Sequence, residues 1–136
     1  MSKIGFIGLG IMGGTMAKAL IAHRYRVFGF DTDPAKRRTL NRMGGQSETD
    51  LASIVEQCSV LITALPSSSA LLEAVHQIAF YSSKKKKPVL IETSTLTLED
   101  KLEAKRALDA RKIAMIDAPI SGTAHPDPAS QWIIFV

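Results

Sequence analysis

Cysteine is almost absent from this sequence, and its scarcity excludes several classes of protein. The single cysteine, Cys58, has no partner for an internal disulfide, which is typical of proteins kept in a reducing compartment. Because Cys58 precedes an apolar run, we expect an inert thiol buried in the core. The three histidines are scattered without the spacing of metal ligands, so we expect no metal site.

Long apolar runs are also missing. No segment approaches the roughly 20 apolar residues that a membrane helix needs. The first residues, Met1 to Phe6, contain no apolar stretch followed by a cleavage site, so nothing there indicates a secretion signal. We therefore expect a cytoplasmic protein that makes no contact with a membrane.

Aromatic side chains are few, at 6% of the sequence, and none lies within its most basic segment. Lysine and arginine outnumber aspartate and glutamate by 17 to 13, and much of this excess comes from the run Lys84 to Lys87. Without interleaved aromatic residues this run offers nothing on which bases could stack. A solvated loop or helix end is the favoured interpretation, and we expect no nucleic-acid partner.

The composition that is present is that of one globular domain. The chain has 136 residues, of which 46% are hydrophobic and 22% charged, enough to build a core. Short apolar runs alternate with segments of helical periodicity, and we predict a single domain over residues 1–136. The predicted strands are 4–7, 26–31, 59–64, 88–92 and 113–117, with 131–136 as a sixth, and the predicted helices are 11–23, Pro34 to Gly44, 51–57, 68–81 and Thr97 to about Lys112.

The predicted strands are continuous apolar runs, a pattern typical of strands buried on both faces. Strict alternation of strand and helix implies right-handed crossovers between parallel strands. We therefore predict an α/β fold, a doubly wound parallel sheet with helices on both faces, in a chain that stops near its sixth strand.

The most informative motif is the spacing of Gly8, Gly10 and Gly13, which directly follows the first predicted strand and opens the first predicted helix. In this context G-x-G-x-x-G is the fingerprint of a Rossmann-type dinucleotide-binding domain. Gly8 permits a tight turn, Gly10 lets a pyrophosphate approach the backbone, and Gly13 allows close packing of helix on strand. The N–H groups at the helix start then face the phosphates. The candidate cofactor-binding residues of this segment are Gly8, Leu9, Gly10, Ile11, Met12 and Gly13.

A carboxylate follows at the end of the second predicted strand. Asp31 can accept hydrogen bonds from the hydroxyls of the adenosine ribose, and it would repel a 2′-phosphate. This favours NAD over NADP as the cofactor. Arg37 and Arg38 begin the next helix and leave the opposite interpretation open, since a guanidinium could reach such a phosphate, although a solvated helix face is the simpler explanation for both.

Four segments together resemble the β-hydroxyacid dehydrogenases, a family that includes 3-hydroxyisobutyrate dehydrogenase and tartronate semialdehyde reductase and is related to 6-phosphogluconate dehydrogenase. They occur in the family's order and cover nearly the whole chain. The segments are Gly5 to Gly13 with Met16, Ala17 and Leu20, then Leu65-Pro66, then Glu92-Thr93-Ser94-Thr95 in place of Asp-x-Ser-Thr, and finally Asp117-Ala118-Pro119-Ile120-Ser121-Gly122-Thr123 in place of Asp-Ala-Pro-Val-Ser-Gly-Gly.

This resemblance implies further site residues and an activity. Leu65, Pro66 and Thr95 would contact the cofactor, with Thr95 on the nicotinamide side. Ser121 and Gly122, with Thr123 beside them, would hold the carboxylate of the substrate. Members of the family oxidise a 3-hydroxy acid, or reduce the matching semialdehyde, by hydride exchange with the nicotinamide.

The sequence also departs from the family pattern. Ala70 stands where the family often has an asparagine, and Thr123 replaces a glycine of the substrate motif. The segment Ala124 to Ser130 replaces a glycine-containing loop of small residues, and two prolines stiffen it. These departures affect one cofactor contact and the geometry of the substrate loop.

The family's proton-transfer lysine lies well downstream, on a helix leading into an all-helical second domain that supplies most of the dimer contact. This chain stops at Val136, and none of its lysines has the family's sequence context, so we expect no catalytic residue here and cofactor binding without turnover. Two alternatives stay open. One is a non-catalytic, dehydrogenase-like binding or interaction module, and the other is an enzyme of the same fold with a different substrate, such as an imine reductase or 6-phosphogluconate dehydrogenase.

Overall fold

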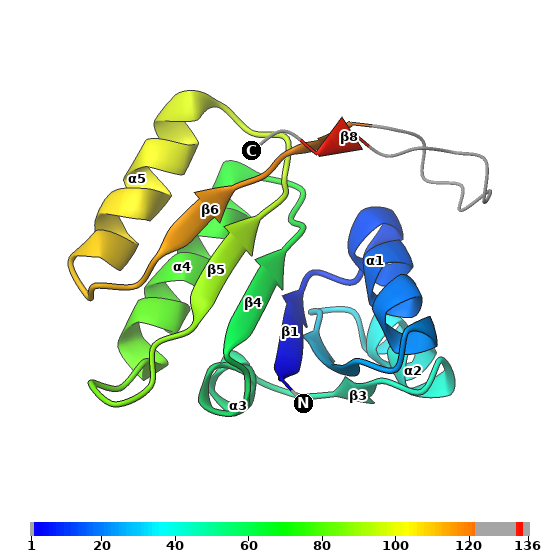
Figure 1. Cartoon of the computed structure of the whole chain (residues 1–136). Coiled ribbons are helices and arrows are strands. Elements are labelled where there is room, and N and C mark those ends of the chain that lie inside the picture. The colour runs from blue at the N-terminus through cyan, green and yellow to red at the C-terminus, as the bar shows by residue number, and fades with distance from the viewer. Residues whose placement is uncertain (1, 122–132, 135–136) are drawn as a thin grey trace.

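The computed structural model describes residues 2–121 and 133–134, and its centre is a six-stranded sheet in the order β3-β2-β1-β4-β5-β6 (Figure 1). Every neighbouring pair in this sheet is parallel. The predicted α/β fold is therefore confirmed. The strands are β1 (Lys3–Ile7), β2 (Arg26–Phe30), β3 (Gln46–Ser47), β4 (Val60–Thr63), β5 (Val89–Glu92) and β6 (Met115–Asp117).

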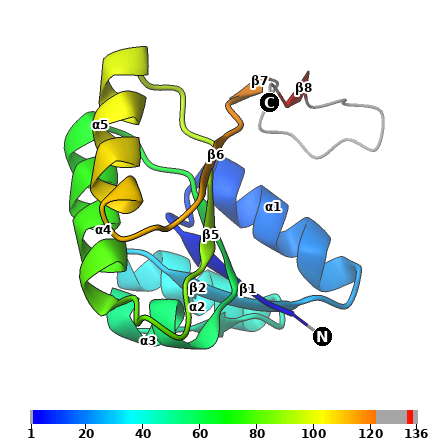
Figure 2. The same ribbon diagram turned by 60° about the vertical axis from the view of Figure 1, so that its left-hand side comes forward.

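In the described part of the chain five helices cover the two faces of this sheet, as the views in Figures 1 and 2 show for α1 on one side and α4 with α5 on the other. The first two helices pack with β1 and β2 around the buried side chains of Phe6, Val27 and Leu40. The other three pack together over the opposite face, around residues such as Leu61 and Leu90. The helices are α1 (Ile11–Ala22), α2 (Pro34–Arg42), α3 (Leu51–Gln57), α4 (Ser68–Tyr81) and α5 (Leu98–Asp109).

Side-chain caps fix where four of the helices begin. A polar residue just before each helix accepts a hydrogen bond from a backbone N–H of the first turn, which that turn cannot satisfy internally. The caps are Asp33 for α2, Asp50 for α3, Ser67 for α4 and Thr97 for α5. The starts predicted at Asp33-Pro34 and at Thr97 are confirmed, and α5 ends at Asp109, three residues before the predicted end.

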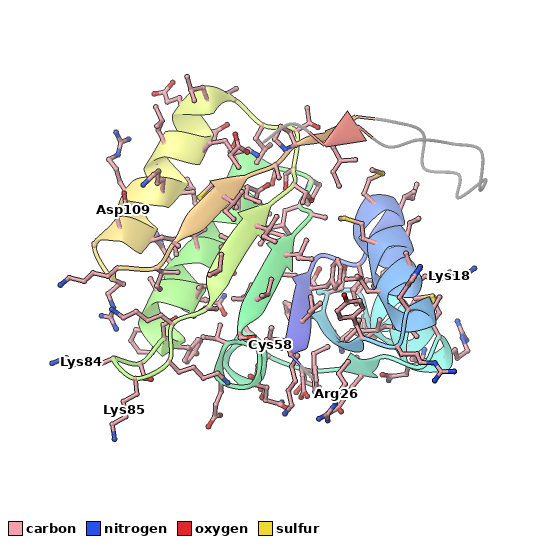
Figure 3. The ribbon with its side chains drawn as sticks, in the orientation of Figure 1. Lys18, Arg26, Cys58, Lys84, Lys85 and Asp109 are labelled. Atoms are coloured by element: carbon pink, nitrogen blue, oxygen red, sulfur yellow. The ribbon has the colours of Figure 1, made fainter. Side chains whose placement is uncertain are left out.

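Cys58 is fully buried among apolar side chains between α3 and β4, as expected, and Figure 3 shows its position near the sheet. Burial raises the pKa of its thiol from 9.0 to about 11. The thiol is therefore protonated at neutral pH and is shielded from reagents in solution.

The prediction of 131–136 as the sixth strand of the main sheet is wrong. Of these residues the structure describes Ile133–Ile134, which form β8 and pair antiparallel with β7 (Ile120–Ser121) in a separate two-stranded sheet. The sixth place in the main sheet belongs to β3, whose two residues Gln46 and Ser47 pair with Phe28 and Gly29. Nothing in their polar sequence marked them as a strand.

Within the described ranges, none of the helices is long and apolar enough to cross a membrane. The same residues contain no group of three or more histidine, cysteine, aspartate or glutamate side chains arranged to hold a metal ion.

Candidate functional site

Two positions in the turn between β1 and α1 require glycine. Gly8 has a φ of +94°, a conformation that side chains rarely adopt, and a Cβ there would overlap the carbonyl oxygen of Ala64. A Cβ on Gly13 would overlap the carbonyl oxygen of Gly8. These two glycines let α1 pack directly against the ends of β1 and β4.

Gly10 differs, because apart from its own atoms and those of its two chain neighbours nothing lies within 4 Å of the position its Cβ would take. The fold therefore does not require glycine here, and the space in front of the backbone is open. Gly10 is also the N-cap of α1 and offers no side-chain cap to the helix. The first N–H groups of α1 consequently face this opening, where an anion can bind to them. The turn fits the pyrophosphate of a dinucleotide.

Asp31 is held rigidly beside this turn. Its Oδ2 accepts a hydrogen bond of 2.9 Å from the backbone N–H of Leu9, and its Oδ1 accepts one of 2.8 Å from Asp33. Each carboxylate oxygen keeps lone pairs for further donors, such as ribose hydroxyls. The Arg37 guanidinium donates to the carbonyl oxygen of Asp31 over 2.7 Å, so it is engaged with the backbone.

The opposite wall comes from the loops after β4 and β5, which are tied to each other. The backbone N–H of Leu65 donates to the Ser94 hydroxyl oxygen over 2.8 Å. The Thr93 hydroxyl donates to the carbonyl oxygen of Thr63 over 2.8 Å. These bonds fix the positions of Leu65 and of the segment that leads to Thr95.

Together these elements line one cleft with a volume of about 500 Å³ at the carboxyl ends of the central strands. The cleft is bordered by Gly8, Gly10, Ile11, Met12, Gly13, Asp31, Leu65, Pro66 and Thr95, nine of the ten residues predicted to bind the cofactor. Leu9, the tenth, does not border it. Leu9 is 5% exposed and packs in the core, and its backbone N–H donates a hydrogen bond to Asp31, which does border the cleft.

The structure adds lining residues to which the sequence analysis assigned no site role, some of them inside the motifs themselves. They are chiefly the chain neighbours of the predicted residues at strand ends: Ile7, Phe30, Thr32, Ala64, Thr93 and Ser94, with Ile120 from β7. Ala70, noted above as a departure from the family pattern, also borders the cleft. The sequence signal that could have identified them was their position beside a predicted site residue at the end of an apolar run.

The predicted substrate segment begins at this cleft. Ile120 borders it, and Ser121 follows directly in β7, where it pairs with Ile133. Gly122 and Thr123, the other two residues predicted to bind substrate, lie outside the described residues, as does the segment Ala124 to Ser130.

The basic run lies elsewhere. Lys84 to Lys87 are exposed and belong to the loop after α4, as predicted. Figure 3 shows Lys84 and Lys85 at the end of the molecule from which the parallel strands start, whereas the cleft is at the end where they finish.

A parallel sheet of this order, with a glycine turn between β1 and α1 and a cleft beside it, defines the class: a dinucleotide-binding domain of the Rossmann type. A sequence model described as the NAD binding domain of 6-phosphogluconate dehydrogenase matches residues 3–136. The chain belongs to this family, and its cofactor is a nicotinamide dinucleotide.

Individual relatives agree with this assignment. The mitochondrial 3-hydroxyisobutyrate dehydrogenase of Rattus norvegicus is 34% identical over 122 residues, which cover 89% of this chain and 36% of that protein. The 3-hydroxyisobutyrate dehydrogenase of Pseudomonas aeruginosa is 32% identical over 124 residues, covering 90% of this chain and 41% of that protein. The chain thus spans about two fifths of the length of the curated relatives it matches.

A solved structure agrees with this assignment. The Mycobacterium tuberculosis 3-hydroxyisobutyrate dehydrogenase with L-serine superposes with a TM-score of 0.85 at 26% identity, over 91% of this chain and 42% of that one. The chain is therefore similar to the NAD-binding domain of 3-hydroxyisobutyrate dehydrogenase-like oxidoreductases.

Proposed function

We propose that this chain is the cofactor-binding part of an oxidoreductase that uses NAD to oxidise a 3-hydroxy acid or to reduce the corresponding semialdehyde. The observation that carries the proposal is the open space in front of Gly10, between the first turn of α1 and the Asp31 carboxylate. When bound there, the nicotinamide cofactor supplies hydride exchange. The chain's own residues bind the cofactor and orient it.

NAD is preferred over NADP because of the charge at the adenosine end of the cleft. The Asp31 carboxylate is fixed by two backbone N–H groups and would face a 2′-phosphate with like charge. Arg37, which could otherwise neutralise that phosphate, is bound to the carbonyl oxygen of Asp31.

Substrate binding is assigned to Ser121, Gly122 and Thr123, because they directly follow Ile120 at the edge of the cleft. A hydroxyl and backbone N–H groups suit the carboxylate of a hydroxy acid. The hydroxyl proton needs a positioned base. By family resemblance that base is a lysine outside residues 1–136, so we expect this chain alone to bind NAD without turnover. A cytoplasmic location and a homo-oligomer formed through the helical second domain stay predictions from the sequence.

The test of cofactor binding is a calorimetric titration of NADH into the chain and into its Gly10→Val variant. A valine side chain at Gly10 enters open space, so the fold is retained, but it occupies the position assigned to the pyrophosphate. We expect the affinity for NADH to fall by about tenfold to a hundredfold, the scale of losing charge-assisted hydrogen bonds.

The matched control is Ala22→Val, which enlarges an exposed residue at the far end of the same helix and leaves the cleft untouched. It should bind NADH like the unmodified chain. Equal affinity of the folded Gly10→Val variant and the unmodified chain would refute the placement of the pyrophosphate.

A further inference from the structure

A buried lysine, Lys101, lies beside the part of the cleft that would hold the nicotinamide, and the sequence did not predict it. The side chains of Lys101 and Glu92 are 6% and 0% exposed. Lys101 sits near the N-terminus of α5, where the helix dipole disfavours a positive charge. An ammonium is tolerated in such a place only if its surroundings satisfy it fully.

The partners of Lys101 come from two different segments. Its Nζ lies 2.7 Å from the carbonyl oxygen of Ser94, 2.7 Å from Oδ1 of Asp117 and 3.5 Å from Oε1 of Glu92. Glu92 in turn accepts hydrogen bonds of 2.5 Å from the Thr63 hydroxyl and from the Ser94 backbone N–H. Each buried side-chain polar atom of this group thus has a hydrogen-bond partner, while the Asp117 side chain is 47% exposed.

Lys101 also separates two carboxylates. Glu92 and Asp117 are register partners at the ends of the adjacent strands β5 and β6. Neighbouring strands lie only about 4.8 Å apart, so two carboxylates at this position would repel each other. The ammonium between them holds the ends of β5 and β6 together.

These contacts extend to the lining of the cleft. Ser94, held through its carbonyl oxygen by Lys101, uses its hydroxyl to hold the N–H of Leu65, and it directly precedes Thr95. Asp117 begins the segment that reaches the cleft at Ile120. We propose that Lys101 is a positioning residue that sets the nicotinamide half of the cleft by fixing the loops after β4, β5 and β6 relative to one another.

This inference deepens the proposed function and rests on it. The sheet order places the adenosine half of a dinucleotide over β1 and β2 and the nicotinamide half over β4 and β5. The hydrogen-bond partners of Lys101 are Glu92, Ser94 and Asp117, which all lie on the β5–β6 side of the sheet, beside the nicotinamide half. Loss of Lys101 should therefore weaken binding of the nicotinamide ring, while binding of the adenosine and pyrophosphate parts is retained.

The experiment compares the Kd of NADH with that of ADP-ribose, which has the same adenosine, pyrophosphate and ribose but no nicotinamide. The variants are Lys101→Met and the double variant E92Q/K101M, which also removes the charge that Lys101→Met leaves buried and so carries the test if the single variant does not fold. The preference for NADH over ADP-ribose should fall by about five- to tenfold in the folded variants, the loss expected for one or two weakened hydrogen bonds.

Lys105→Met is the matched control. It removes a lysine one turn further along α5 that pairs with Asp109 in solvent, and it should keep the preference of the unmodified chain. An unchanged preference in folded Lys101 variants would overturn the positioning role. This includes the case in which the affinities for NADH and for ADP-ribose fall by the same factor. Failure of the unmodified chain to bind either ligand would instead refute the proposed function, and the positioning role with it.

Discussion

Asp31 has a structural role in the glycine turn and a proposed role in cofactor selection. Its carboxylate accepts a hydrogen bond from the backbone N–H of Leu9, which fixes the glycine turn, and it also borders the cleft at the end proposed to hold the adenosine. The sequence predicted the second role from the position of Asp31 at a strand end. The first role requires a contact between residues 22 positions apart, which spacing alone does not reveal.

The choice between NAD and NADP is tested by Asp31→Asn. This substitution removes the charge and keeps one oxygen, which can accept from the Leu9 N–H that fixes the turn, while the hydrogen bond from the Asp33 N–H is lost. We expect the preference for NAD over NADP, measured as the ratio of the two Kd values, to fall by about tenfold. A charged carboxylate accepts stronger hydrogen bonds from the ribose hydroxyls of NAD than a neutral amide does, and only the carboxylate repels the 2′-phosphate of NADP. Asp109→Asn removes an exposed carboxylate on α5 and should leave the ratio as it is. An unaltered ratio in Asp31→Asn would remove Asp31 from cofactor selection.

At the level of elements, the sequence predicted helix starts better than strand partners. A helix start depends on local chemistry, such as the Asp33 side chain accepting from Ala35 within α2's first turn. Strand pairing depends on distant residues. The apolar residues Ile133 and Ile134 have the composition of a strand, but nothing local indicated that they pair antiparallel with Ile120 and Ser121 and stay outside the main sheet.

The starts of α4 and α5 are joined by a hydrogen bond that responds to pH. The Ser68 hydroxyl donates to Oδ2 of Asp100 over 2.5 Å. This bond, together with one from Thr97, lowers the pKa of Asp100 below its ordinary value of 3.8. Because the pKa is lower in the folded state, the stabilisation is present above about pH 4 and is lost as the pH falls through the folded-state pKa.

We therefore expect Ser68→Ala to be less stable than the unmodified chain at pH 6, with the difference shrinking toward pH 3. Urea unfolding across this pH range measures it. Ser69→Ala, an exposed neighbour whose hydroxyl faces Ser67, serves as the control and should show a difference that does not change with pH. A difference for Ser68→Ala that stayed constant with pH would refute the coupling to Asp100.

At the scale of the whole molecule, the parallel sheet explains why the candidate site could be assembled from separate motifs. Each motif follows an apolar run, and the carboxyl ends of β1, β2, β4 and β5 meet at one edge. Residues named from strand ends, such as Pro66 and Thr95, therefore border one cleft. Lys101 could not be predicted in this way, because it lies on α5 and not at the end of a strand. It does not border the cleft itself and acts through its contact with Ser94.

The central claim is that the cleft beside the glycine turn receives the dinucleotide. The most direct measurement is a two-dimensional NMR titration of the isotopically labelled chain with NADH. We expect the backbone amide signals of Gly10 to Gly13, Leu65 and Thr95 to shift on addition of NADH, while those of Lys84 to Lys87, at the opposite end of the molecule, stay unchanged. Shifts confined to the lysine loop, with the signals of the glycine turn unmoved, would contradict the account.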